Sequence, residues 1–259
     1  MPKRKPKRKT QLKKVFILNK REGETPLAAL SRLRAKNKKY EGIKMTYAGR
    51  LDPMASGVLI VLAGEATKDK EKYLALGKEY EFAVLFGFTT DTHDILGKIV
   101  NSTIPKNINP KDITKNLKYF RGQFQQKYPL YSSKTVGGKQ LWQYGRASED
   151  VELPAREVLV HKFEFLSLKK IAGRRLLSDI LKRIGKVEGD FRQKEILSIW
   201  RKNLRGKSKA EFFLASFKIK CGSGTYVRGL VDSLGERMGV PALAYRIKRT
   251  KVGKFVKIS

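Results

Sequence analysis

Residues 49–59 read GRLDPMASGVL and place one aspartate, Asp52, between two glycines and just before an apolar run. An Asp-Pro pair favours a turn, and flanking glycines let the backbone pass close to a ligand. Residues 58–63 are all apolar and predict a strand. An aspartate held on such a turn is a candidate nucleophile or base. Asp-Pro turns are also common without any catalytic role, so the pattern alone leaves a purely structural turn open.

A second glycine turn, residues 222–230 (GSGTYVRGL), delivers Tyr226 and Arg228 to the start of a helix expected over residues 226–238. An arginine at this place is suited to pair with a carboxylate through its planar, forked guanidinium. A solvated arginine or a phosphate contact is an equal alternative in so basic a chain.

The rest of the chain predicts helices and strands in mixed order. Thr25 and Pro26 are suited to the N-cap and first position of a helix. Apolar spacing predicts an amphipathic helix over residues 176–184, and Asp190 is a candidate cap for a second helix. Residues 120–147 have no firm period and are interpreted as a long structured loop. Further strands are expected at residues 14–18, 80–88, 212–221 and 246–255.

The charge of the chain is its most unusual bulk property. Of 259 residues, 57 are Lys or Arg and 24 are Asp or Glu, which gives a net charge of +33. Such an excess indicates a polyanionic partner, and nucleic acid fits best. One cysteine and two histidines argue against a disulfide framework and leave little for a metal centre. We find neither a membrane-span-length apolar run nor a secretory signal, so a reducing cytoplasmic compartment is expected.

Several segments together resemble the TruB-type tRNA pseudouridine synthases. The resemblance runs from about residue 15 to residue 255 and keeps the order of the motifs. The segments that carry it are GRLDPMASGVL (49–59), GEATK (64–68), KEY (78–80), FRG (120–122), QKYPLYSSK (126–134), GKQL (138–141) and GTYVRGL (224–230).

This resemblance implies an α+β fold with a mixed, largely antiparallel sheet, flanking helices and a central cleft. It implies isomerisation of uridine to pseudouridine at position 55 in the T-loop of tRNA. The family uses no cofactor and no metal, which agrees with the scarcity of histidine and cysteine here. The implied partner is tRNA, with no membrane and no obligate protein partner.

The resemblance also implies catalytic roles. Asp52 would attack the nucleoside and let uracil detach, after which the ring turns and rejoins through carbon. Tyr80 would stack on the flipped base and serve in removing the C5 proton. Arg228 would pair with Asp52 and keep it charged and oriented.

Four further residues are implied to bind the substrate, with Tyr80. Tyr226 and Ile247 would line the uracil pocket, and Lys68 would make a structural or phosphate contact. Tyr47 stands where the family usually has a histidine that contacts RNA beside the flipped base. A tyrosine there can stack and donate a hydrogen bond, but it carries no positive charge near neutral pH.

The basic, proline-containing N-terminus predicts a disordered arm, residues 1–13, and the resemblance implies a catalytic domain, residues 14–259. Within that domain we expect an RNA-clasping thumb loop at about 123–146 and a basic helical insertion at about 169–209. The family's common C-terminal PUA-type RNA-binding domain is expected to be absent, with the arm and insertion supplying RNA affinity in its place. Both stretches are open to the plainer interpretation that they only solubilise the protein. Two other functions stay open: an RNA chaperone that folds tRNA with little turnover, and a guide-dependent, dyskerin-like synthase acting on another RNA.

Overall fold

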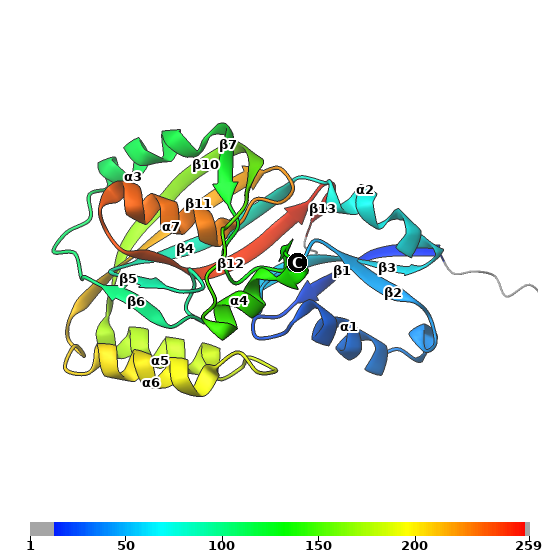
Figure 1. Ribbon diagram of the computed structural model, residues 1–259, viewed down its shortest axis with the longest axis horizontal. Helices are drawn as coiled ribbons and strands as arrows, with labels where there is room; N and C mark the ends of the chain where they lie inside the picture. Colours follow the sequence, from blue (N-terminus) through cyan, green and yellow to red (C-terminus); the bar gives the residue numbers. More distant parts are fainter. Residues whose placement is uncertain (1–12, 257–259) are drawn as a thin grey trace, which may run out of the picture.

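Nine strands form one connected sheet in the computed structural model, which describes residues 13–256 (Figure 1). The order is β1-β3-β12-β4-β11-β10-β7, with β2 paired to β3 and β13 to β12. Within this sheet β12 and β3 run parallel and the other pairs are antiparallel. The strands are β1 (Lys13–Lys20), β2 (Met45–Ala48), β3 (Ala55–Gly64), β4 (Lys78–Phe86), β7 (Gly122–Lys127), β10 (Ala155–Ala172), β11 (Glu211–Cys221), β12 (Ala242–Val252) and β13 (Phe255–Val256). The expected α+β class with a mixed, largely antiparallel sheet is confirmed.

Helices cover both faces of this sheet. Helices α3 and α7 pack on one face through a core that includes Leu117 and Leu230, and α5 and α6 pack on the other through Leu176 and Trp200. The helices are α1 (Pro26–Ala35), α2 (Lys70–Leu74), α3 (Pro110–Leu117), α4 (Leu141–Ala147), α5 (Gly173–Ile184), α6 (Gln193–Leu204) and α7 (Val227–Met238), with 3-10 turns at Lys38–Tyr40, Glu65–Asp69 and Lys118–Phe120. Two small hairpins pair β5 (Phe88–Thr90) with β6 (Ile99–Ser102) and β8 (Thr135–Val136) with β9 (Lys139–Gln140).

Local sequence signals explain several of these elements. The hydroxyl of Thr25 accepts a hydrogen bond from the backbone N–H of Ala28, and Pro26 takes the first position of α1, as predicted. In α5 the helical spacing of Leu176, Ile180 and Ile184 buries one face, also as predicted.

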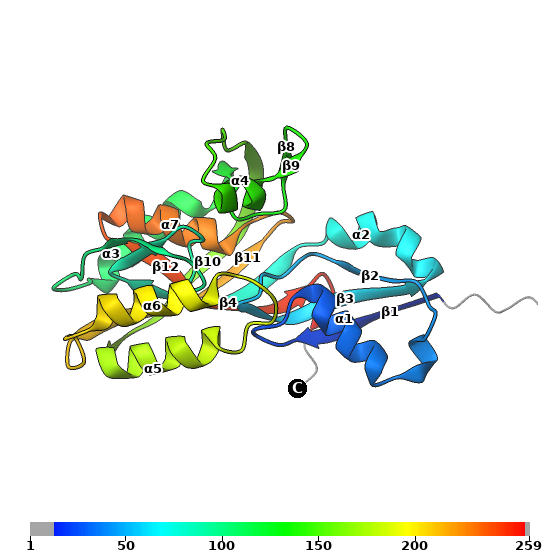
Figure 2. The same cartoon turned by 60° about the horizontal axis from the view of Figure 1, so that its bottom comes forward.

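The segment 120–147 is more ordered than the sequence analysis expected. Residues 122–127 form β7, which pairs with β10 at the edge of the sheet, and residues 141–147 form α4. The two inward-facing residues of β7 are Phe124 and Gln126, and because only one of them is apolar, the strand shows no hydrophobic alternation in the sequence. The part that stands out from the body is therefore β8, β9 and α4, which we call the thumb, residues 128–147 (Figure 2).

Two other predicted boundaries differ from the structure. Residues 169–172 of the expected helical insertion are the end of β10, so the helical part comprises α5, α6 and the loop between them. Asp190 does not cap α6, because the helix begins at Gln193 behind Arg192 and the Asp190 carboxylate accepts hydrogen bonds from Arg146 and the backbone of Arg192 instead.

The predicted arm, residues 1–13, falls almost entirely outside the described residues, and Lys13 opens β1. Among residues 13–256 there is no helix with both the length and the apolar character needed to cross a bilayer.

Candidate active site

Asp52 and Arg228 meet although 175 residues separate them in the chain. Asp52 lies in the turn between β2 and β3, and Arg228 lies in the first turn of α7. The arginine Nε donates a hydrogen bond of 2.7 Å to Asp52 Oδ2. Arg228 is 3% exposed and the Asp52 side chain is 32% exposed. The predicted pairing is therefore present, and it fixes one carboxylate oxygen while the group stays open to solvent.

The other donors of Arg228 are also engaged. Its Nη1 donates to the carbonyl of Thr92, and its Nη2 donates to the carbonyl of Tyr131 at 3.3 Å. A second carboxylate, Asp94, lies 3.9 Å from Nε. Burial opposes the charge of Arg228, but the carboxylates of Asp52 and Asp94 raise its pKa above the usual value. The guanidinium is therefore a permanently charged, fully oriented fork.

Asp94 is a buried acid that the sequence analysis did not single out. Its Oδ1 accepts hydrogen bonds from the Thr92 hydroxyl at 2.8 Å and from the Leu96 N–H at 2.9 Å. Burial raises the pKa of Asp94, against the opposing charge of Arg228. The turn 91–97 thereby becomes a rigid neighbour of the Asp52–Arg228 pair.

Lys20 anchors the chain just after Asp52. This lysine ends β1, is fully buried, and donates to the carbonyls of Ala55 at 2.6 Å, Arg21 at 2.8 Å and Pro53 at 3.3 Å. Burial lowers the pKa of Lys20 to about 8, so it remains largely charged at neutral pH. The ammonium thus fixes the turn from the β1 side.

Arg249 anchors the chain just before and after the same turn. Only 1% exposed, it donates from Nε to Val58 O at 2.7 Å, from Nη2 to Gly49 O at 2.9 Å and from Nη1 to Arg50 O at 3.4 Å. A Cβ on Gly57 would lie 2.1 Å from the Arg249 carbonyl oxygen, so only glycine permits this approach of β3 to β12. Sequence reasoning missed both anchors, because a lone Lys or Arg in so basic a chain resembles a solvated side chain.

Two apolar residues close to Asp52 in the sequence also hold the turn in place. Leu51 is buried in the core under α3 and α7, whereas Met54 is buried in the core under α5 and α6. The two residues flank Asp52-Pro53 and point into opposite faces of the sheet. Displacement of Asp52 would therefore disturb two cores at once.

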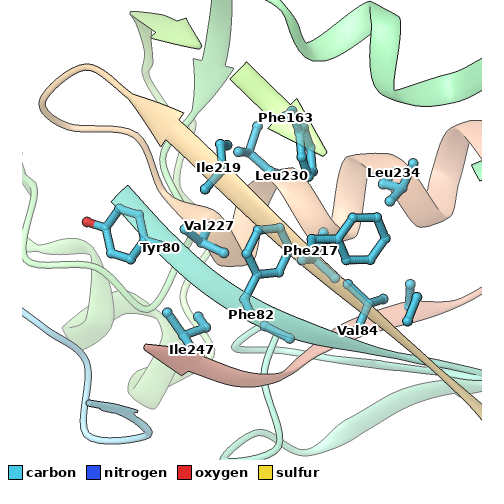
Figure 3. Close-up of a cluster of buried hydrophobic side chains, with 14 of the residues drawn as sticks. Tyr80, Phe82, Val84, Phe163, Phe217, Ile219, Val227, Leu230, Leu234 and Ile247 are labelled. Atoms are coloured by element: carbon cyan, nitrogen blue, oxygen red, sulfur yellow. The ribbon is translucent and has the colours of Figure 1, made fainter. Parts of the chain in front are cut away.

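Tyr80, Ile247 and Tyr226 lie around this pair. Tyr80 of β4 and Ile247 of β12 belong to one buried cluster, and Figure 3 shows the Tyr80 hydroxyl directed away from the apolar side chains of that cluster. Tyr226 precedes α7, and its ring meets Tyr128 edge-on with centroids 5.7 Å apart. Burial raises the pKa of both Tyr80 and Tyr226, and the negative charge of Asp52 acts in the same direction. Both phenols are therefore neutral donors at physiological pH.

Gln126, inside the predicted RNA-clasping segment, holds Tyr226 in place. Its amide donates to Tyr226 O at 2.9 Å and accepts from Tyr226 N at 2.9 Å. The two-way bond couples edge strand β7 to the start of α7. A paired backbone and side-chain amide of this kind leaves no signal in a sequence pattern.

Lys68 and Tyr47 are less closely tied to the pair. The Lys68 side chain is 75% exposed and forms an ion pair with Glu65, with 2.5 Å between Nζ and Oε2. Tyr47 is half-buried on β2, where it pairs with Val61 of β3. No contact found within residues 13–256 joins either side chain to Asp52, so their substrate-binding roles stay predictions.

Most of this chain matches known proteins in sequence. The model of the TruB family pseudouridylate synthase N-terminal domain matches residues 34–172. The tRNA pseudouridine synthase B of Limosilactobacillus reuteri is 32% identical over 242 residues, which cover 93% of this chain and 67% of that protein. The enzyme of the same name from Caldanaerobacter subterraneus is 34% identical over 219 residues, covering 84% and 62%. The chain thus spans about two thirds of the length of these relatives.

Solved structures share the fold at lower identity. The structure of a Cbf5-Nop10-Gar1 complex matches with a TM-score of 0.59 and 20% identity, covering 96% of this chain and 51% of that chain. An H/ACA RNP bound to a substrate RNA matches with a TM-score of 0.55 and 19% identity, covering 94% and 49%. These likenesses concern the fold, whereas the family match and the identities to the bacterial proteins concern the sequence. The chain belongs to the TruB family of pseudouridylate synthases.

Proposed function

We propose that this protein isomerises uridine to pseudouridine at position 55 in the T-loop of tRNA. The observation that carries the proposal is the hydrogen-bonded Asp52–Arg228 pair in a member of this family. Arg228 occupies Oδ2 of the carboxylate, and no hydrogen bond within residues 13–256 reaches Oδ1. One oxygen is thus oriented by the protein, and the other is free to attack.

The chemistry follows from this geometry. The free oxygen of Asp52 attacks C1′ of the nucleoside, and the C1′–N1 bond breaks so that uracil detaches. The ring turns, C5 bonds to C1′ as the bond between C1′ and the Asp52 oxygen breaks, the proton on C5 leaves and N1 gains a proton. Tyr80, with its hydroxyl at the edge of the apolar cluster, is the group we assign to help remove the C5 proton, as a relay that accepts this proton on its oxygen while it gives up its own. Arg228 holds Oδ2 of Asp52 through the hydrogen bond from its Nε, so the carboxylate is oriented before attack.

Substrate recognition requires that the target base leave its stack. Enzymes that act on a base flip it out, and an aromatic ring replaces the lost stacking at about 1–3 kcal/mol per base. Tyr80 supplies that ring, Ile247 an apolar wall, and Tyr226 a side chain held by Gln126. The thumb, with its projecting hairpin and α4, fits an RNA clasp (Figure 2). A buried free thiol at Cys221 suits a reducing cytoplasm.

The decisive test is to incubate the purified protein with unmodified tRNA and map pseudouridine at nucleotide resolution. We expect product at position 55 of the T-loop. A tRNA with cytidine at that position serves as the control and is expected to remain unmodified. Product at another site would contradict the assigned target, and refolding of tRNA without any product would favour an RNA chaperone.

Tyr80→Phe is expected to retain tRNA binding and to give stalled or very slow product formation. Phenylalanine keeps the ring for stacking but lacks the hydroxyl assigned to C5 deprotonation. Single-turnover rates and tRNA affinity of the wild type, Tyr80→Phe and Tyr80→Leu are to be measured together. Equal binding by the Phe and Leu variants would show that stacking is not the contribution of this ring.

A pocket on α5 is lined mainly by basic side chains. Arg174, Arg175 and Lys182 line it and are exposed, whereas its one acid, Asp179, lies beside the buried Arg183. We expect replacement of the three basic residues by alanine to weaken tRNA binding and leave the single-turnover rate unchanged. Each lost phosphate contact should flatten the log–log salt dependence by ~0.7–0.9.

The measurement is tRNA affinity against salt concentration. The matched control replaces three exposed lysines in α3 and just before it, Lys106, Lys111 and Lys115, which changes the net charge by the same amount. A wild-type slope in the α5 variant would show that these side chains only solubilise the protein. Equal flattening in both variants would show that charge matters without regard to place.

A further inference from the structure

Arg192 has three features that its place in a surface loop does not require. It lies between α5 and α6 and has a φ of 62°, in the left-handed region that non-glycine residues rarely adopt. Its side chain is only 15% exposed. Its guanidinium carbon lies 4.4 Å from the centroid of the Tyr131 ring. A strained backbone beside a largely enclosed charge points to a specific role for the side chain.

The Arg192 guanidinium joins two separate segments of the chain. Its Nη1 donates to Asp91 Oδ2 at 2.7 Å and to the Tyr131 hydroxyl at 2.7 Å, and its Nη2 donates to Asp91 Oδ1 at 3.3 Å. Asp91 lies in the turn that connects β5 to β6, and Tyr131 belongs to the thumb. One side chain thus fixes the distance between that turn and the thumb.

These are the same two segments that orient Arg228. The carbonyl of Thr92, next to Asp91, accepts from Arg228 Nη1, and the carbonyl of Tyr131 itself accepts from Nη2. The third donor of Arg228, Nε, then points at Asp52. The position of the two carbonyls decides the direction of the Arg228 fork, and Arg192 spans the segments that carry them.

The loop that carries Arg192 is itself fixed at two points. Arg183, near the end of α5, makes a two-pronged pair with Glu22, at 2.9 and 2.8 Å. Further along the loop, the Glu188 N–H donates to Gly23 O at 3.0 Å. Both contacts are made with residues 22–23, which follow the buried Lys20. They fix the loop on this side, and the Arg192 side chain extends from it to Asp91 and Tyr131.

We propose that Arg192 is a positioning residue for the isomerisation: it braces the turn 91–94 against Tyr131 of the thumb, and so aligns Arg228 with Asp52. The proposal rests on the proposed function for its kinetic readout. An alternative role in binding RNA phosphates is disfavoured, because the side chain is only 15% exposed and its guanidinium already donates to Asp91 and Tyr131. The α5–α6 hairpin also lies beyond the residues that the family model matches, so the brace belongs to a part of this chain outside that match.

The test compares Arg192→Ala with the wild type in single-turnover rate and in tRNA affinity. We expect the rate to fall roughly tenfold, a barrier change of about 1.4 kcal/mol, while the Kd for tRNA stays within about twofold. Arg192→Lys keeps the charge but cannot form the fork, so an intermediate rate is expected. A weaker Kd with an unchanged rate would identify Arg192 as an RNA contact and overturn the proposal.

Arg237→Ala is the matched control. Arg237 also stacks on a tyrosine, with its guanidinium carbon 3.6 Å from the centroid of the Tyr119 ring, but it lies at the far end of α7 and is exposed. Its loss removes the same charge and the same kind of stacking without touching the brace. A tenfold lower rate in this control as well would contradict a specific role for Arg192.

A double-mutant cycle tests the route through Tyr131. Tyr131→Phe keeps the ring but loses the acceptor for Arg192 and the hydrogen bond to Gly145 at 2.9 Å. If Arg192 acts through this hydroxyl, the effects of Arg192→Ala and Tyr131→Phe on the rate are smaller together than the product of the two. Fully multiplicative effects would overturn the proposed route.

A last readout does not depend on turnover. The Nε–H of Arg228, buried and bonded to Asp52, is expected to exchange slowly with solvent, as followed by ¹⁵N NMR. Arg192→Ala should speed this exchange, and Arg237→Ala should leave it unchanged. Faster exchange in a protein without synthase activity would keep the brace and reject the proposed function. Unchanged exchange in an active protein would reject the brace alone.

Discussion

Asp52→Asn is expected to abolish pseudouridine formation while the affinity for tRNA stays within about twofold of the wild type, because phosphate contacts dominate that affinity. Asparagine keeps the shape of the side chain, and its carbonyl oxygen can still accept the hydrogen bond from Arg228 Nε. An amide is a poor nucleophile, so the first bond to the nucleoside does not form. Leu51, Lys20 and Arg249 hold the turn without help from the carboxylate, so the fold should be retained.

The measurement is single-turnover product formation beside tRNA binding and thermal stability. Asp112→Asn, at an exposed aspartate on α3, is the matched control for the loss of one negative charge and is expected to retain the wild-type rate. Turnover by Asp52→Asn near the wild-type rate would overturn the nucleophile assignment. Loss of tRNA binding along with activity would instead show that Asp52 contacts the RNA in the ground state.

The turn that carries Asp52 was predictable from sequence because its signals are local. The Asp-Pro pair, the flanking glycines and the apolar run 58–63 all lie within fifteen residues, and β3 follows where that run predicts a strand. The first turn of α7 was predictable for the same reason. The family resemblance then supplied what local signals could not, namely that Asp52 and Arg228 meet.

The anchors of the turn were not predictable in this way. Lys20 reaches Ala55 across 35 positions and Arg249 reaches Gly49 across 200, and neither contact leaves a periodic trace. In a chain with 57 basic residues, a lysine or arginine is by default interpreted as solvated. Only the fold shows that these two charges are buried on backbone carbonyls, where each has hydrogen-bond partners that offset its loss of water.

The helix of the thumb, α4, could not be predicted for a different reason. Helix α4 begins behind Gln140, whose N–H donates to the Gln143 side chain at 2.7 Å. Glutamine is not among the residues preferred at an N-cap, so the usual start signal is missing. The start of α6 also lacks a local signal. The residue before it is Arg192, whose left-handed conformation goes with its contacts to Asp91 and Tyr131, far away in the sequence.

Arg228→Lys is expected to lower the single-turnover rate by ~100-fold, about 2.7 kcal/mol in barrier height, although the charge is kept. The guanidinium serves three acceptors in fixed directions: Asp52, the Thr92 carbonyl and the Tyr131 carbonyl. A lysine ammonium sits on a flexible stem and cannot reproduce that planar fork. Carbonyl acceptors left without a donor around the Arg228 side chain, which is 3% exposed, carry a desolvation cost, so a lower melting temperature is also expected.

Comparison of Arg228→Met with Arg228→Lys separates the effect of the charge from that of the geometry, because methionine lacks both and lysine keeps the charge. Arg228→Met removes the counter-charge of Asp52 and of the buried Asp94, whose pKa burial already raises, so the pKa of Asp94 should rise further. Breaking a buried pair typically costs about 3–5 kcal/mol of stability, which makes this the less stable of the two variants. If orientation is the main contribution of Arg228, the Lys variant loses most of the rate while retaining more of the stability. A wild-type rate in Arg228→Lys would show that positive charge alone is enough, and that the fork held by Thr92 and Tyr131 does not direct Asp52.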